Sequence, residues 1–401
     1  MSSYAALLKT PGVARLIAAQ LTARFPFGML SLAILIHVEQ IFDSYGSAGL
    51  VLAAMSVGQA IAGPLTSRLM GRLGMRPVIL VTMVVCAASI ITMAVVPMGV
   101  LSLMLVGFVS GLSMPPIQPA VRTIYPKVVN SRQLTPLFAL DASAQEIIWV
   151  LGPVIATFVA IQVSTVAGIL LAAVFLIGGS TWFLLLPEVG RVRIPRSRRK
   201  IGVVLKKPAV LLSTVVGFML VAACAAVEAG VVAVFGHGSA NSGWVLGIFA
   251  IGSLIGGLAL GHRPIGPWAL AARMLVIAVG LLLASLWLTF GWLAFALLLA
   301  GVGIAPAFAV LFGIVSASVK FSDTAEAYGW VGTGQLMGAA MGSAAAGFSI
   351  DHSGAVAAIY VAAGFALTGC VIAAAARRHA PDLRGRDIAP IPDTEPITVV
   401  S

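Results

Sequence analysis

The sequence predicts an all-α polytopic membrane protein with twelve transmembrane helices arranged in two six-helix bundles. Composition is the first reason: hydrophobic residues make up 60% and charged residues only 9% of the 401 residues. Ordinary soluble domains carry about 25% charged residues. The apolar residues also form long runs, which match the ~20 residues that a helix needs to cross a hydrocarbon core of ~30 Å. Lipid is therefore expected to cover most of the surface.

Apolar runs bounded by Gly, Pro and charged residues give the expected spans. In the first half of the chain they lie at 13–38, 47–69, 77–97, 99–121, 137–160 and 164–186. In the second half they lie at 209–235, 242–261, 268–288, 291–317, 325–350 and 354–376. Each span ends where Gly, Pro or a charged residue interrupts the apolar run.

The lysines and arginines indicate how the helices are oriented. The net charge is +11, but the basic residues occupy short loops and form no face interleaved with aromatics, which argues against nucleic acid as a partner. If the N-terminus is inside, every one of the 24 lysines and arginines except Arg24 falls in or beside a cytoplasmic segment, as the positive-inside rule requires. We therefore expect a multi-pass protein of the plasma membrane with both termini cytoplasmic.

A basic stretch between the sixth and seventh spans divides the chain. We expect residues 1–187 to form the N-terminal six-helix half and residues 208–378 the C-terminal half. Residues 188–207 then form a cytoplasmic linker, which could also contact anionic lipid headgroups. The short, Pro-rich tail at 379–401 is expected to be disordered.

The two halves resemble each other in sequence. One constant offset sets residues 49–63 over residues 243–257, and it places Gly58 and Gly63 on glycines of the second half. The matching segments are the second span of each half, which favours an internal duplication. Two parallel repeats around a central pathway are a known transporter design.

The loop between the second and third spans resembles the signature loop of the major facilitator superfamily. Arg72, Gly74 and Arg76 match the family pattern, whereas Gly71 stands where the family has Asp. The resemblance implies the major facilitator fold and a conformational gating role for the three matching residues. The residues alone predict a turn glycine and cations that cap the end of the second span.

A second resemblance lies in the fifth span. Gly152-Pro153 matches the core of the motif found in drug/proton antiporters of the same superfamily, although the antiporters' arginine in the fourth span is replaced by Gly107. Pro frees a backbone carbonyl and permits a kink. A moving helix could use this kink for conformational gating, and a static kink is the alternative.

Two charged residues lie deep in the expected spans. Arg24 is in the middle of the first span, and Glu146 is at a comparable depth in the fifth. An ionised side chain at the bilayer centre costs at least ~2.5–3.5 kcal/mol, so such residues usually pair. We therefore expect Glu146 to be the partner of Arg24. Their pair is either permanent or proton-coupling, since the proton affinity of a carboxyl changes as a cavity around it opens and closes.

Two further carboxylates are candidates. Asp141 is expected one turn inside the fifth span, where it could meet Arg122 or Arg76 and serve a structural or gating role. Glu228 lies in the outer half of the seventh span with no cation near it in sequence. A carboxyl in that setting is a candidate for proton exchange.

These observations predict a secondary transporter that works by alternating access around a cavity at the membrane midplane. The motifs favour proton-coupled efflux of a small amphipathic or drug-like compound. A proton-coupled carrier of a metabolite such as a sugar or amino acid is the alternative, and a membrane-embedded sensor or enzyme is the alternative outside transport. The expected partners are a small-molecule substrate, protons and membrane lipids, and the protein is expected to function as a monomer.

No cofactor or metal is expected. The three cysteines lie singly in apolar runs without the spacing of metal ligands, at Cys86, Cys224 and Cys370. An enzyme would be expected to show clusters of His or carboxylate residues near one membrane face, and the sequence shows none.

Overall fold

A computed structural model describes residues 2–197, 200–236 and 240–393. The first part of the chain forms ten helices: α1 (Ser2–Lys9), α2 (Val13–Arg24), α3 (Pro26–Phe42), α4 (Tyr45–Leu73), α5 (Met75–Val95), α6 (Val100–Leu112), α7 (Ile117–Val128), α8 (Ser131–Gln162), α9 (Thr165–Leu185) and α10 (Pro187–Arg191). The second part forms α11 (Pro208–Phe235), α12 (Ala240–Leu260), α13 (Ala269–Ala284), α14 (Phe290–Gly301), α15 (Ile304–Ser318), α16 (Phe321–Ser353) and α17 (Ala355–Ala375). Short 3₁₀ turns lie at Val203–Lys206 and Arg377–His379.

These helices make twelve passes, because α2 with α3, α6 with α7, and α14 with α15 each form one interrupted pass. Ten segments of the described chain are long and apolar enough to span a membrane. Of the other two passes, α13 is short at 16 residues and α16 carries several charged residues. The breaks follow the sequence, since Pro26 begins α3 and Pro116 precedes α7. The predicted fold class is confirmed.

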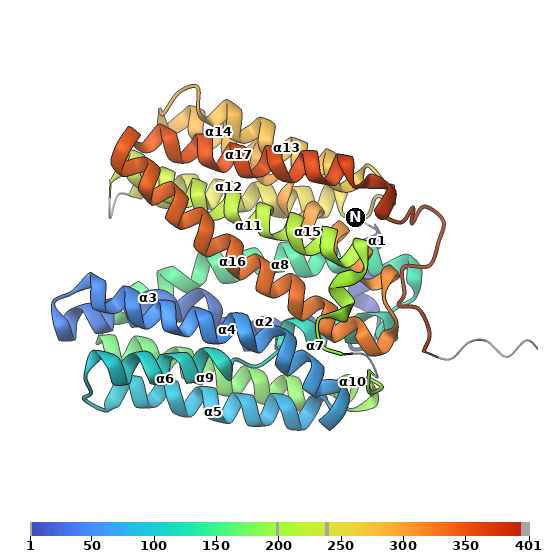
Figure 1. Cartoon of the computed structure of the whole chain (residues 1–401), viewed down its shortest axis with the longest axis horizontal. Helices are drawn as coiled ribbons and strands as arrows, with labels where there is room; N and C mark the ends of the chain where they lie inside the picture. The colour runs from blue at the N-terminus through green and yellow to red at the C-terminus, as the bar shows by residue number, and fades with distance from the viewer. Residues whose placement is uncertain (1, 198–199, 237–239, 394–401) are drawn as a thin grey trace, which may run out of the picture.

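The passes are arranged in two bundles (Figure 1). Helices α2–α9 form the N-terminal half, and α11–α17 form the C-terminal half, in which α11 packs against α16 and α17. Across the boundary, α4 packs against α16, and α8 packs against α12 and α15. We call one end of the bundles the basic end, because lysines and arginines lie in or beside its connections, at 74, 129–130, 186–207, 261–268, 319–320 and 376–393. The other end is the opposite end.

The two halves use equivalent glycines at their boundary. A Cβ on Gly63 of α4 would lie 3.0 Å from the carbonyl oxygen of Gly329 in α16. Its sequence equivalent, Gly257 of α12, stands against Ser143 of α8, whose side chain would overlap an added Cβ. Each half therefore approaches the other through the same position of its second pass, which agrees with an internal duplication.

Helix α1 was not among the expected elements. It lies at the basic end and packs against α8, with Leu7 fully buried. The Tyr4 hydroxyl donates to the carbonyl oxygen of Gly257 in α12 at 2.8 Å, so α1 connects the two halves. Burial raises the pKa of Tyr4 to about 12, and the hydroxyl therefore keeps its proton at physiological pH.

The prediction of a disordered tail is wrong for residues 379–393. The Leu383 amide donates to the carbonyl oxygen of Ile265 at 2.9 Å. Ile391 forms a parallel bridge with Lys320, and Ile388 is 3% exposed. Apolar residues spaced along the polar tail allow it to be buried against the loops of the basic end. Residues 394–401 lie outside the described residues.

Candidate functional site

Asp141 of α8 is the centre of a buried polar cluster. It is fully buried and accepts hydrogen bonds from four side chains. The donors are Gln20 Nε2 at 3.0 Å, Arg24 Nη1 at 3.3 Å, Arg122 Nε at 3.1 Å and the Tyr125 hydroxyl at 3.1 Å. An ionised carboxylate has about four lone-pair sites, so these donors satisfy it. We call these five residues the Asp141 cluster.

The expected pair between Arg24 and Glu146 is wrong, because Arg24 pairs with Asp141. Arg24 ends α2, and its guanidinium also donates to Gln145 Oε1. Asp141 and Gln145 are one helical turn apart, so they lie on the same face of α8. Glu146 is the next residue after Gln145 and is turned by about 100° around the helix axis, toward α12.

Asp141 lies farther from the start of its helix than the sequence predicted. Helix α8 begins at Ser131, about two turns before the expected start of this span, and Asp141 is therefore nearly three turns inside the helix. The expected contact with Arg122 is confirmed. Arg76 takes no part in the cluster, since it donates to the carbonyl oxygen of Leu186 at 3.3 Å.

The Asp141 cluster contains more positive than negative charge. Arg24 and Arg122 together carry two positive charges, against one negative charge on Asp141. Arg122 is stabilised further by an aromatic ring of the other half, because its guanidinium lies 3.4 Å from the ring centroid of Phe312 in α15. The cluster of the N-terminal half is thereby in direct contact with the C-terminal half.

A pair of carboxylates lies on the same boundary. Glu146 of α8 accepts a hydrogen bond from Ser253 of α12 at 2.8 Å. Glu228 of α11 is exposed and lies close enough to Glu146 for the two carboxylates to interact electrostatically. No lysine or arginine of the described residues forms an ion pair with either one. We call Glu146 and Glu228 the carboxylate pair, and each half supplies one member.

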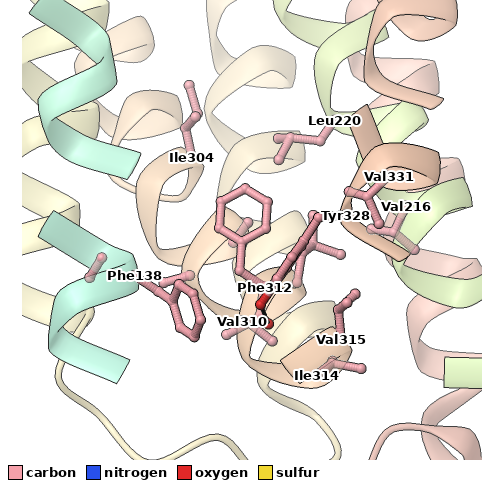
Figure 2. Close-up of a cluster of buried hydrophobic side chains, with 14 of the residues drawn as sticks. Phe138, Val216, Leu220, Ile304, Val310, Phe312, Ile314, Val315, Tyr328 and Val331 are labelled. Carbon is pink, nitrogen blue, oxygen red and sulfur yellow. Dashed lines mark hydrogen bonds between the residues drawn. The ribbon is translucent and has the colours of Figure 1, made fainter. Parts of the chain in front are cut away.

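Aromatic side chains join the halves toward the basic end. Phe138 of α8 lies 6.3 Å from Phe312 and 6.4 Å from Tyr328, measured between ring centroids. Figure 2 shows Phe138 reaching from α8 toward these two rings of the C-terminal half. The Tyr328 hydroxyl donates to the carbonyl oxygen of Phe312 at 3.0 Å, which orients both residues. These contacts exclude water from the boundary at this level.

Polar contacts between α4 and α16 reinforce the same region. The Thr333 hydroxyl donates to the carbonyl oxygen of Ala60 at 2.8 Å. Closer to the basic end, Arg68 Nη1 and Glu326 Oε2 form an ion pair at 2.8 Å. These contacts lie between the middle of the helices and the basic end, so the halves are joined there in this conformation.

Residues of the signature loop have different surroundings. Gly74 joins α4 to α5 with φ +93°, and its amide donates to the carbonyl oxygen of Met70 at 3.0 Å. Arg72 is exposed beside Arg68. The glycine that replaces the family's Asp also has a structural reason, because a Cβ on Gly71 would lie 3.2 Å from the carbonyl oxygen of Pro195 in the linker.

Gly152 allows α8 to pack closely against α3. A Cβ on Gly152 would lie 2.7 Å from the carbonyl carbon of Gly28, so the two backbones touch. Pro153 lies inside α8, which continues without interruption to Gln162. Gly152 therefore serves helix packing, whether or not α8 also moves.

Sequence reasoning did not find several residues of the site. Gln20 and Gln145 are polar residues one turn from Arg24 and Asp141, and this spacing was the signal that could have identified them. Tyr125 and Ser253 gave no such signal. Among the described residues, no three His, Cys, Asp or Glu side chains come together in a way that could hold a metal ion.

Two six-helix bundles joined around buried charges define a polytopic membrane protein of the transporter type. The sequence matches the model of the Major Facilitator Superfamily over residues 16–288. This match covers more than half of the chain, which therefore belongs to the major facilitator superfamily and is a secondary transporter rather than an enzyme. No curated protein matches the sequence.

Solved structures share the fold at low identity. The human organic anion transporter MFSD10 (TETRAN) has a TM-score of 0.69 and 17% identity, and the match covers 90% of this chain and 98% of that one. A bacterial homologue of the iron transporter ferroportin in an outward-facing state has a TM-score of 0.70 and 14% identity, with 91% and 98% covered. At these identities the likeness shows the fold alone.

Proposed function

We propose that this transporter works by alternating access and couples the movement of protons to the efflux of a small amphipathic or drug-like compound. The observation that carries the proposal is the carboxylate pair. Glu146 and Glu228 come from different halves, lie inside long apolar helices and have no basic partner among the described residues. Such carboxylates in a membrane protein usually mark a proton or substrate pathway.

Movement of the halves changes the surroundings of Glu146. Ser253 donates to Glu146 across the boundary, and Glu228 acts on it electrostatically. Separation of the halves at this level removes both influences and so changes the affinity of Glu146 for a proton. One proton that moves down a potential of 100 mV supplies about 2.3 kcal/mol, enough for roughly fiftyfold accumulation of a substrate.

The basic end is the cytoplasmic end in this proposal, because lysines and arginines accumulate on that side. The plasma membrane is the membrane in which it acts. The contacts at Phe138 and Arg68 then close the cytoplasmic side, and the conformation is outward-facing. The outward-facing state of the similar bacterial structure supports this assignment.

Substitution of Glu146 tests the coupling. Glu146→Gln keeps the shape and the hydrogen bond to Ser253 but cannot exchange a proton. In proteoliposomes with an imposed pH gradient, we expect uphill transport to be lost while exchange of substrate without net proton movement continues. The matched control is Glu39→Gln. It changes a carboxylate of α3 that lies near the opposite end of the bundles, and it should leave both activities unchanged. Unchanged pH-driven transport by Glu146→Gln would refute the assignment.

A second candidate function is transport of an organic anion. Arg24 and Arg122 leave one positive charge of the Asp141 cluster without a matching anion, and a similar structure is that of an organic anion transporter. A panel of anionic, cationic and neutral amphiphiles and metabolites in the same proteoliposomes separates the candidates. Transport limited to anions would favour this second function over the first.

A further inference from the structure

A cavity of about 1040 Å³ lies at the basic end, between α4 and the linker that joins the two halves. Its lining combines basic and apolar side chains. The basic ones are Arg68, Arg72, Arg196 and Lys200, and the apolar ones include Leu65 and Ile201. Among the described residues, no acidic side chain lines the cavity.

The positive charge in this cavity is only partly neutralised. Arg68 forms an ion pair with Glu326. Arg72, Arg196 and Lys200 are exposed, and no Asp or Glu of the described residues forms an ion pair with them. Three cations that converge on one cavity favour a ligand with a phosphate group, since cationic side chains donate several hydrogen bonds to phosphate oxygens.

The apolar residues indicate which phosphate compound fits. Leu65 is 42% and Ile201 is 49% exposed, so the cavity opens onto apolar surface as well as onto charge. Leu65 stands on α4 about two turns before its basic end, so it lies nearer the middle of the helix than Arg68 and Arg72 do. A free phosphate would use the cations but not these residues, whereas a phospholipid would use both.

We propose that this cavity binds the headgroup of an anionic phospholipid, with its phosphate among Arg72, Arg196 and Lys200 and an acyl chain along Leu65 and Ile201. The site adds a lipid ligand to the proposed transport function and does not depend on its substrate or coupling ion.

The bound lipid would act at the contact between the two halves. Glu326 of α16 pairs with Arg68 of α4 and also accepts from the amide of Gly202 in the linker at 2.7 Å. The hydroxyl of Ser197 in the linker donates to Asp323 of α16 at 2.6 Å. Arg196 is the residue before Ser197 in the linker. A headgroup held by Arg196 therefore fixes the linker in the position in which the linker connects the two halves. Lipid binding stabilises the conformation in which the basic end is closed.

Lipid titration of the purified full-length protein tests this site. We would measure binding of short-chain phosphatidylglycerol in a neutral detergent and compare the wild type with Arg196→Gln/Lys200→Gln. Each cation near an anionic headgroup contributes about fivefold, so the double variant should bind about thirtyfold more weakly. Phosphatidylcholine of the same chain length and inorganic phosphate should each fail to displace the lipid.

Two variants serve as controls. Arg263→Gln/Arg378→Gln removes two exposed cations at the same end but away from the cavity, and its affinity should stay within about threefold of the wild type. Arg196→Lys/Lys200→Arg keeps the charge and should keep the binding. Equal loss of affinity in both Gln double variants would overturn the site in favour of the general charge of the basic end. Displacement by phosphate alone would overturn the lipid assignment, and equal affinity for phosphatidylcholine would overturn the role of the cations.

Discussion

Single residues in the middle of this protein have many partners. Asp141 neutralises Arg24 and Arg122 and orients Tyr125 and Gln20. All of these atoms are removed from water, and a buried ion pair that loses one member leaves an uncompensated charge. The stability of the N-terminal half therefore depends strongly on this one carboxylate.

The first prediction concerns that carboxylate. Asp141→Asn should destabilise the protein by about 3–5 kcal/mol, because it leaves two buried guanidinium groups without a counterion. Thermal unfolding in detergent measures the loss. The control is Asp382→Asn in the tail, whose carboxylate has its pKa lowered to about 2 by hydrogen bonds from Arg384. That pair is exposed and screened by water, so the control should unfold like the wild type. Equal stability of the two variants would contradict the role of Asp141.

Gly74 illustrates a backbone requirement at the same scale. Its φ of +93° is rarely adopted by residues with a side chain, so Gly74→Ala should cost about 1–3 kcal/mol. Gly178 is the matched control, since it lies inside α9 with no atom near an added Cβ. Gly178→Ala should leave stability equal or slightly higher, because Ala favours a helix. If both variants unfolded at the same temperature, the turn between α4 and α5 would not need glycine.

At the scale of elements, α8 has the largest share in the site. Its Asp141 and Gln145 side chains contact α2 and α7, whereas its Phe138 and Glu146 side chains contact the C-terminal half. A rotation or shift of α8 would alter the Asp141 cluster and the carboxylate pair together. The close approach of Gly152 to α3 limits such movement within the N-terminal half.

Helix α1 is the element with the most direct test. Tyr4→Phe removes the hydrogen bond to Gly257, which is worth about 0.5–1.5 kcal/mol. The population open at the basic end should therefore rise by roughly twofold to tenfold. Labelling of a cysteine introduced at Ala139, which faces Gly261 across this contact, reports that opening. Unchanged labelling would mean that α1 packs there without any effect on the conformational equilibrium.

At the scale of the whole molecule, the distribution of charge predicts the orientation in the membrane. Reporter fusions after Arg132, Lys200 and Arg378 should all report the cytoplasm, because these positions belong to the basic end. Fusions after Gly99 and Gly354, in loops of the opposite end, should report the outside. A mixed result within either group would refute the proposed orientation.

The sequence by itself determined the membrane class and the number of passes, and it identified Arg24 and Asp141 as charges inside the spans. These follow from runs of apolar residues, since the cost of placing a residue in lipid depends mainly on the residue and its neighbours in the chain. Arg24 and Asp141 were therefore recognised singly, whereas Arg122 was expected at the cytoplasmic edge and is buried. Sequence reasoning failed on the partner of Arg24, because it placed the start of α8 too late and gave no rotation for Glu146.

Only the tertiary structure decided which groups meet. Whether Arg24 meets Asp141 or Glu146 depends on how far α2 and α8 slide and rotate against each other, and the glycine contact between Gly28 and Gly152 helps to set that packing. The same holds for α1 and the tail, whose few apolar residues have no partner until the helices around them are packed. Contacts between distant segments arise from packing, and no local run of residues records them.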